Sequence, residues 1–339
     1  MTAPSAHPRP FRRLRRRLPA AAAVLLLATG AGGCVTVHGE RALLPATGKA
    51  DAERTVRHFV EATNVANGKL DPGPAGQVET GALALIDGAG LKARHVNHPA
   101  GNPGYQPLVF HDTRYLIPRQ RGWPKWFVVD TAENRDASRW LLVFTRGGSH
   151  EAWRASYLNV VAPAELPVFA TDGDGYAEPV GPTAQGLAVQ PGQLGARYTD
   201  YLQHGEKGAA LFAGGAWTSG LRQTRRTRYA PTPEVYTQFA DEAADPAQYP
   251  PVALRLADGG ALVFFTTHHL MRQTVAHGPV KVTDPQIAAL LTGTPGKSVT
   301  LVDLAEQVVR VPPEATGGAA NHQVTFLNRI EGTVSASGR

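Results

Sequence analysis

The sequence predicts an α+β fold of two tandem domains, each a helical segment followed by a curved antiparallel sheet. Three observations support this prediction: apolar residues recur with helical spacing at the start of each half, aromatic and β-branched runs follow, and turn residues separate those runs. The 27 Pro and 36 Gly residues favour many turns, and 42% hydrophobic residues are typical of a globular protein.

The first 33 residues have the pattern of a secretory signal peptide. A basic segment over residues 11–18 precedes a short apolar stretch centred on residues 24–27, and small residues follow. The apolar stretch is shorter than the ~20 residues that span a bilayer. We therefore predict a signal peptide over residues 1–33.

The small residues Ala31, Gly32 and Gly33 directly before Cys34 resemble a lipobox, the cleavage site of prolipoproteins. The resemblance implies cleavage between Gly33 and Cys34, a diacylglyceryl group on Cys34, and a location at the extracytoplasmic face of the cell membrane. Two acyl chains are what stable anchoring requires. The alternative is an ordinary signal cleavage with Cys34 incidental. Both Sec and twin-arginine export remain open.

The basic character of the chain belongs to this leader. Six arginines precede Cys34, and without them 28 of the 34 Lys and Arg residues remain, against 28 Asp and Glu. A formally neutral mature chain gives no reason to expect a nucleic-acid partner. Cys34 is the single cysteine, so an internal disulfide bond is excluded.

A tether is expected over residues 34–50, before a first domain over 51–163. Val56, Phe59 and Thr63 recur at i, i+3 and i+7 and predict a helix, and a second helix is predicted over 73–86. From residue 91 the sequence changes to strands. Their predicted ranges are 107–117, 125–131, 140–145 and 153–161.

A linker over residues 164–190 precedes a second domain over 191–335. Its predicted helices cover 194–202, 233–243 and 284–291, and its predicted strands cover 252–256, 261–267, 299–311 and 324–334. The similar order of elements predicts a duplicated domain. Helices on one face of a curved sheet would look like the cystatin-like or NTF2-like roll, an analogy that implies no activity.

Two motifs resemble ligand loops but lack necessary residues. The segment 293–298 looks like a phosphate-binding loop, yet Leu291 stands where the first glycine is needed and a strand-like run follows. The segment 172–176 resembles the start of a calcium loop, but its twelfth position is Thr183 in place of a bidentate carboxylate. We predict turns at both places, with no bound nucleotide, metal or other cofactor.

A speculative ligand site combines two groups of residues. His95, His98 and His111 form the densest polar cluster, in a predicted loop where solvated histidines are commoner than ligands. Trp123 and Trp126 lie in a tryptophan-rich stretch that could form a stacking platform, although a sheet core is the alternative. No Gly-x-Ser-x-Gly motif occurs, so no catalytic residue is predicted.

Several segments together resemble an actinobacterial family of secreted lipoproteins with a domain of unknown function. They are residues 52–64, 94–98, 115–119, 122–127 and 139–145. The resemblance covers nearly the whole mature chain and implies no activity and no catalytic residue. We expect a non-catalytic envelope module that binds a protein or a cell-wall ligand. The alternatives are a cell-surface hydrolase or isomerase with a pocket in the first domain, and a structural or assembly factor.

Overall fold

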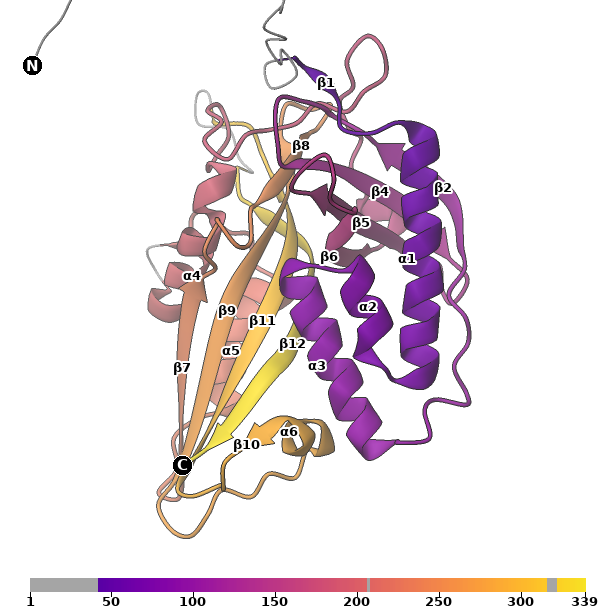
Figure 1. Ribbon diagram of the computed structural model, residues 1–339. Helices are drawn as coiled ribbons and strands as arrows, with labels where there is room; N and C mark the ends of the chain where they lie inside the picture. Colours follow the sequence, from indigo (N-terminus) through magenta and orange to yellow (C-terminus); the bar gives the residue numbers. More distant parts are fainter. Residues whose placement is uncertain (1–41, 206–207, 316–321) are drawn as a thin grey trace, which may run out of the picture. The chain divides into compact units, whose positions relative to one another are not determined.

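The computed structural model describes residues 42–205, 208–315 and 322–339, and residues 40–339 form one compact unit. It confirms the predicted α+β class, with two main sheets and helices packed against them (Figure 1). The predicted signal peptide and the predicted lipid attachment at Cys34 lie outside the described residues.

The first sheet is antiparallel, with strand order β2-β4-β5-β6, and three helices precede it. These helices are α1 (Lys49–Lys69), α2 (Pro72–Val78) and α3 (Gly81–Asn97). The strands are β2 (Phe110–Leu116), β4 (Lys125–Glu133), β5 (Arg139–Arg146) and β6 (Arg154–Val161). A separate pair joins β1 (Leu44–Pro45) to β3 (Arg119–Gln120).

The second sheet has the order β10-β12-β11-β9-β7, with β8 also paired to β9 and only the β10–β12 pair parallel. Its strands are β7 (Val235–Ala243), β8 (Val252–Arg255), β9 (Ala261–Val275), β10 (Leu291–Thr292), β11 (Ser298–Val311) and β12 (Thr325–Gly338). The accompanying helices are α4 (Leu194–His204), α5 (Leu221–Arg228) and α6 (Pro285–Leu290). Short helical turns cover Pro163–Glu165, Pro191–Gln193 and Ala216–Gly220.

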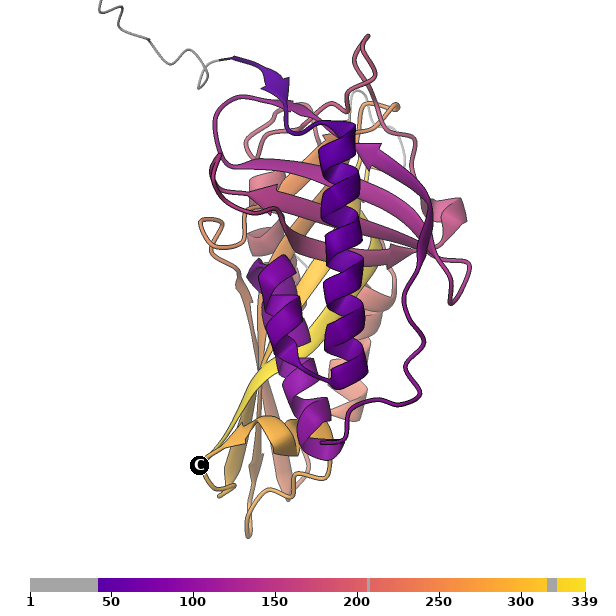
Figure 2. The same ribbon diagram turned by 45° about the vertical axis from the view of Figure 1, so that its right-hand side comes forward.

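The two sheets pack face to face. Successive side chains in a strand point to opposite faces, so one strand contributes to two different hydrophobic clusters. In β5, Leu142 belongs to the hydrophobic cluster under α1, whereas Leu141 belongs to a cluster shared with Leu262 of β9. In β9, Val263 points the other way, into the cluster that contains Tyr198 of α4. Figure 2 shows α1 lying across the strands of the first sheet. Burial of both faces explains why these strands are almost continuously apolar.

Side chains from the second sheet cover the open edge of the first. The N–H of Leu158 in β6 donates to the Glu306 carboxylate at 3.0 Å, and the N–H of Val160 donates to Asn328 Oδ1 at 3.2 Å. A sheet edge left with unpaired backbone groups invites pairing with other chains. Here these two side chains satisfy backbone donors that a neighbouring strand would otherwise take.

Contacts of the core cross the predicted domain boundary. The cluster between the sheets draws residues from both predicted domains, including Leu141 and Leu262. The predicted linker, 164–190, also bonds to both sides: the N–H of Ala177 donates to Ile117, and that of Val180 donates to Ala253. Strand β1 lies within the range predicted as a tether, and it pairs with β3. The duplication and the roll analogy stay predictions.

Two helix predictions were wrong. The single helix predicted over 73–86 is broken at residues 79–80, because Thr80 donates its N–H to Ala155 of β6 and Gly81 has a φ of +64°. The chain then forms α3 up to Asn97, where strands were expected, since Leu91 and Ala93 continue the buried face. Residues 233–243, predicted as a helix, form β7, which pairs with β9 over nine residues.

Most other predictions of secondary structure agree with the structure to within a few residues: the four strands of the first sheet, helices α4 and α6, strand β8 and the two final strands. Strand β9 begins at Ala261 as predicted but continues to Val275, beyond its predicted end at residue 267. Residues 293–297 form a turn between β10 and β11, as predicted for the segment that resembles a phosphate-binding loop. Helix α5 was not predicted, because its sequence is polar on all sides.

Candidate functional site

The structure separates the histidines of the speculative site from its tryptophans. His95 lies in the last turn of α3 and His98 caps that helix, so His95 is helical and not in a loop as predicted. His111 lies on β2, an edge strand of the first sheet, and all three imidazoles are exposed. None of them lines the cavity to which Trp126 contributes.

That cavity has a volume of about 820 Å³ and lies where the first sheet, the start of α3 and the segment before β8 meet. We call it the inter-sheet cavity. Its lining includes the aromatic residues Trp126, Tyr157 and Tyr249 and several prolines, among them Pro124, Pro250 and Pro251. Sites for small molecules typically enclose ~300–1,000 Å³ and combine apolar walls with a few polar groups. The inter-sheet cavity has both properties.

Two arginines, Arg146 and Arg154, line this cavity. The Arg146 guanidinium lies between two indole rings, 4.9 Å from the ring centre of Trp123 and 4.8 Å from that of Trp153. Within the described part of the chain its buried Nε has no hydrogen-bond partner. A buried, unpaired donor of this kind is costly unless another group binds it.

The surroundings of Arg146 are also cationic. Lys125 stands directly opposite Arg146 in the β4–β5 pairing, and its Nζ lies 5.7 Å from the ring centre of Trp123. Burial and the charge of Arg146 lower the pKa of Lys125. The acidic residue of the cavity wall, Glu151, accepts a hydrogen bond from the N–H of Gly147 at 3.2 Å. This end of the cavity is therefore suited to an anionic group.

The cavity wall also contains the buried hydroxyl of Tyr157. This hydroxyl donates to the carbonyl of Pro250 at 3.0 Å, and Thr266 lies 3.5 Å away. Burial raises the pKa of Tyr157, so the phenol stays neutral. Because its single proton is already donated to Pro250, Tyr157 shapes the cavity and does not supply a base at neutral pH.

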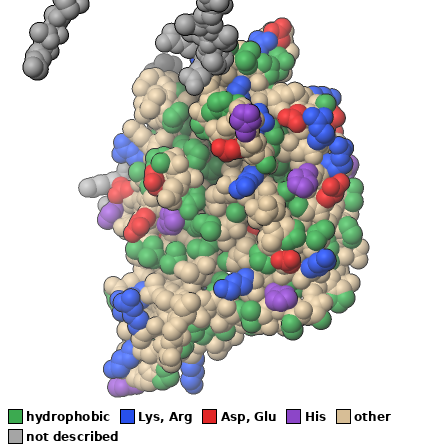
Figure 3. Space-filling view, viewed as in Figure 1, with side chains coloured by type: hydrophobic (Ala, Val, Ile, Leu, Met, Phe, Trp, Pro, Cys, Tyr) green, Lys and Arg blue, Asp and Glu red, His purple; other side chains and the backbone are tan. Residues whose placement is uncertain are grey.

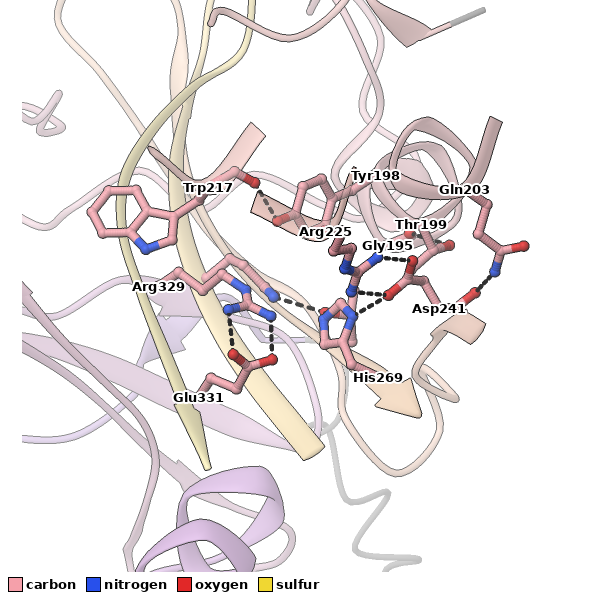
Figure 4. A network of polar contacts seen from close by, with 12 residues as sticks. Gly195, Tyr198, Thr199, Gln203, Trp217, Arg225, Asp241, His269, Arg329 and Glu331 are labelled. Carbon is pink, nitrogen blue, oxygen red and sulfur yellow. Dashed lines mark hydrogen bonds and ion pairs between the residues drawn. The ribbon is translucent and has the colours of Figure 1, made fainter. Parts of the chain in front are cut away.

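A second polar cluster lies between α4, α5 and the second sheet (Figure 4). Asp241 Oδ1 lies 2.6 Å from His269 Nδ1, and His269 Nε2 lies 2.7 Å from Thr267 Oγ1. The order carboxylate, imidazole and hydroxyl is that of a hydrolase triad. However, Asp241, His269 and Thr267 are only 4%, 3% and 0% exposed, so a substrate has no access to the hydroxyl. We interpret this cluster as structural.

Arg225 completes the cluster from α5. Its guanidinium donates to both carboxylate oxygens of Asp241, at 2.6 and 2.8 Å. Burial alone would raise the pKa of Asp241, but the hydrogen bonds from His269 and Arg225 outweigh burial and lower that pKa to about 2. His268 and His269 are adjacent in β9, so their side chains point to opposite faces of the sheet. His269 is buried in this cluster, whereas His268 lies beside Tyr249.

Sequence reasoning missed Arg146, the main polar group of the inter-sheet cavity. It ends a strand that was predicted correctly, but its partners depend on sheet register. The pairing of Lys125 with Arg146 brings Trp123 alongside, and β6 begins just after Trp153. The spacing of these residues along the chain does not indicate that Arg146 lies between Trp123 and Trp153.

Two further properties of residues 42–205, 208–315 and 322–339 bear on function. No three His, Cys, Asp or Glu side chains in these ranges are grouped so that they could hold a metal ion. No helix in them combines the length and apolar character needed to cross a bilayer.

The fold and the cavity define an α+β protein with a ligand-sized pocket where the first sheet, the start of α3 and the segment before β8 meet. The chain belongs to the family described as "Domain of unknown function (DUF8094)", which matches residues 43–338. This membership confirms the predicted resemblance to a family whose domain has no assigned activity.

Relatives from Streptomyces extend the comparison over nearly the whole chain. An "Uncharacterized lipoprotein" of Streptomyces avermitilis is 46% identical over 97% of this chain and 98% of its own length. A second, of Streptomyces coelicolor, is 42% identical over 98% of both chains. Another Streptomyces coelicolor lipoprotein is 25% identical over 90% of this chain and 92% of its own. The comparison with solved structures gives no significant match.

Proposed function

We propose that this protein is a lipid-anchored envelope lipoprotein that binds a small amphipathic molecule in the inter-sheet cavity. The ligand would have an apolar ring or chain as its body and one anionic group. The observation that carries this proposal is Arg146, stacked between two indoles at the cavity with its Nε unpaired among the described residues.

The cavity wall supports this division of the ligand into two parts. Trp126, Tyr249 and the prolines offer rigid apolar surface, which loses little conformational entropy when a ligand binds. Arg146 offers a planar guanidinium that suits a carboxylate, sulfonate or phosphate. The indoles on both sides of it fix its orientation before the ligand arrives.

A non-catalytic role is supported by the chemistry of the polar groups. Tyr157 is held neutral at the cavity, and the Asp241–His269–Thr267 cluster is buried elsewhere. A surface hydrolase or isomerase, the alternative from the sequence, would need an accessible nucleophile or base, and the carboxylate of the cavity wall, Glu151, instead accepts a hydrogen bond from the N–H of Gly147. An assembly factor would need a broad apolar patch. On the face seen in Figure 3, hydrophobic side chains occur in small groups among charged ones.

Fluorescent probes of matched shape can test the binding proposal. Anilinonaphthalene sulfonate has an aromatic body and one anionic group, and phenylnaphthylamine is its neutral counterpart. We would titrate both into the chain from residue 34 with Cys34→Ala, which contains the whole compact unit. Arg146→Gln should weaken binding of the sulfonate about tenfold, since a hydrogen bond to a charged group contributes roughly 1.5–3 kcal/mol. It should leave the neutral probe unaffected.

The matched control is Arg121→Gln, an exposed arginine outside the cavity wall. A second variant, Trp126→Leu, should weaken both probes because it removes apolar wall. Far-ultraviolet circular dichroism and thermal unfolding would verify that each variant is native, since such dyes also bind molten globules. Equal sulfonate affinity in the Arg146 and Arg121 variants would refute the proposed site.

The anchoring part of the proposal rests on the lipobox-like residues before Cys34 and on the names of the relatives. The intact mass of protein extracted from membranes tests it. We expect a chain that begins at residue 34 and carries the mass of a diacylglyceryl group, and a Cys34→Ala variant without that mass. An unmodified Cys34 in the wild-type protein would contradict lipid anchoring.

A further inference from the structure

A second hollow, separate from the inter-sheet cavity, lies beside the edge of the second sheet. It has a volume of about 630 Å³ and runs between the end of α4, helix α5 and strand β7. We call it the α5 groove. Helix α5 lies behind the sheet in Figure 1, on the side away from α3. The two hollows have no lining residue in common.

Three arginines of α5 line this groove. Arg222, Arg225 and Arg226 stand at i, i+3 and i+4, so they share one face of the helix. Helix α5 contains four arginines and no acidic residue. Like charges at this spacing repel each other, and the helix itself offers no carboxylate to offset them.

Most of this charge is uncompensated within the described residues. Arg225 pairs with Asp241, but Arg222 and Arg226 form no ion pair with a described side chain. Arg226 donates to the neutral amide of Gln223 at 2.8 Å, and the Arg222 guanidinium lies 5.3 Å from the ring centre of Tyr201. Because the mature chain is formally neutral, this positive surface is local.

Arg225 is a preorganised donor. Asp241 holds it in a bidentate pair, and its guanidinium carbon lies 4.5 Å from the ring centre of Phe239. A guanidinium has five N–H donors, and the pair with Asp241 uses two of them. Its side chain remains 13% exposed. The buried carboxylate therefore fixes one arginine of the groove, and Arg222 and Arg226 flank it on the same helix face.

We propose that the α5 groove binds a phosphoryl group, with Arg222 and Arg226 as its main donors and Arg225 as the fixed one. Several guanidinium forks facing one hollow suit a multiply charged tetrahedral oxyanion, because each fork can donate two parallel hydrogen bonds. Tyr229 and Tyr236 flank the same hollow and give aromatic surface for the rest of the ligand. The phosphoryl group could belong to a soluble molecule or to a lipid headgroup.

The test uses the chain from residue 34 with Cys34→Ala, so that neither acyl chains nor the basic leader contribute. Three probes are compared: tripolyphosphate, citrate, and vesicles of phosphatidylcholine with or without an equal part of phosphatidylglycerol. The test variant is Arg222→Gln with Arg226→Gln, which spares the Asp241 pair. The charge-matched control is Arg57→Gln with Arg121→Gln, two exposed arginines outside both hollows.

Calorimetric titration with tripolyphosphate and co-sedimentation with vesicles give separate outcomes. A loss of tripolyphosphate affinity of at least about tenfold in the groove variant alone supports a soluble phosphorylated ligand. Loss of sedimentation with phosphatidylglycerol vesicles in that variant alone supports a lipid headgroup. Citrate binding equal to tripolyphosphate binding would overturn the phosphoryl class. Equal behaviour of the groove and control variants, or no binding of either phosphoryl probe, would overturn the site.

Discussion

Asp241 Oδ1 lies 2.6 Å from Nδ1 of His269, while both oxygens of the same carboxylate accept hydrogen bonds from Arg225. One buried carboxylate thus connects β7, β9 and α5. Breaking a buried pair by removing one partner leaves the other charge without compensation, which is far more costly than losing an exposed pair.

Asp241→Ala should therefore destabilise the protein strongly. We expect the free energy of unfolding, measured by urea titration, to fall by about 3–5 kcal/mol. Asp200→Ala is the control, because Asp200 pairs with His204 on the exposed surface of α4. That control should change stability little. If both variants lost similar amounts of unfolding free energy, the burial of Asp241 would make no extra contribution to stability.

The stability that Asp241 contributes should also depend on pH. Its pKa is about 2 in the folded protein against an ordinary 3.8, so the unfolded chain takes up the proton first as the pH falls. The contribution is complete above about pH 4 and disappears toward pH 2. Urea midpoints across this range should fall more steeply for the wild type than for Asp241→Asn. Parallel curves would contradict a depressed pKa.

Glu79 should have the opposite dependence on pH. Burial and the neighbouring carboxyl of Asp87 raise the pKa of Glu79 to about 9, against 4.5 for an ordinary glutamate. The folded protein holds this proton where the unfolded chain has lost it, so the cost of Glu79 increases as the pH rises from about 4.5 to 9. Glu79→Gln should gain stability over the wild type in that range and not below it. The exposed Glu178→Gln variant, measured in parallel, should show no such trend.

Residue 260 must be a glycine because the backbone at Val311 approaches it closely. A Cβ atom at this position would lie 2.7 Å from the carbonyl oxygen of Val311, an atom that cannot move without disturbing β11. Gly260→Ala should lower stability by about 1–3 kcal/mol in thermal unfolding, as overpacking does. Gly173→Ala places its Cβ in open space and serves as the control. An unchanged melting temperature for Gly260→Ala would exclude the clash.

Periodicity predicted the elements whose faces are buried consistently. Val56, Phe59 and Thr63 belong to the first helix, and the strands with two buried faces were recognised from their aromatic and branched residues. Prediction failed where tertiary contacts override local preference. The edge strand β7 has a weak alternation, and its pairing with β9 and its contacts with α4 and α5 stabilise it. The hydrogen bond from Thr80 to Ala155 breaks a helix that the sequence would continue.

The candidate sites were less accessible to sequence reasoning. Trp126 was singled out and lines the inter-sheet cavity, but the histidines grouped with it lie elsewhere because α3 carries His95 and His98 away. Arg146, Asp241 and Arg225 acquire their partners from segments 16 or more residues away or from strand register. A charged residue at the end of a strand looks like ordinary solvated surface until that register is known.

Glu306 and Asn328 accept hydrogen bonds from β6, and this limits which segments can be exchanged between members of this family in chimeric proteins. A chimera joined near residue 163 would combine the β6 edge of one relative with the acceptors of another. Its two halves would assemble only where the carboxylate and the amide still meet the N–H groups of Leu158 and Val160. Side chains at these two positions must therefore be transferred together with β6, although nearly 150 residues separate Leu158 from Glu306.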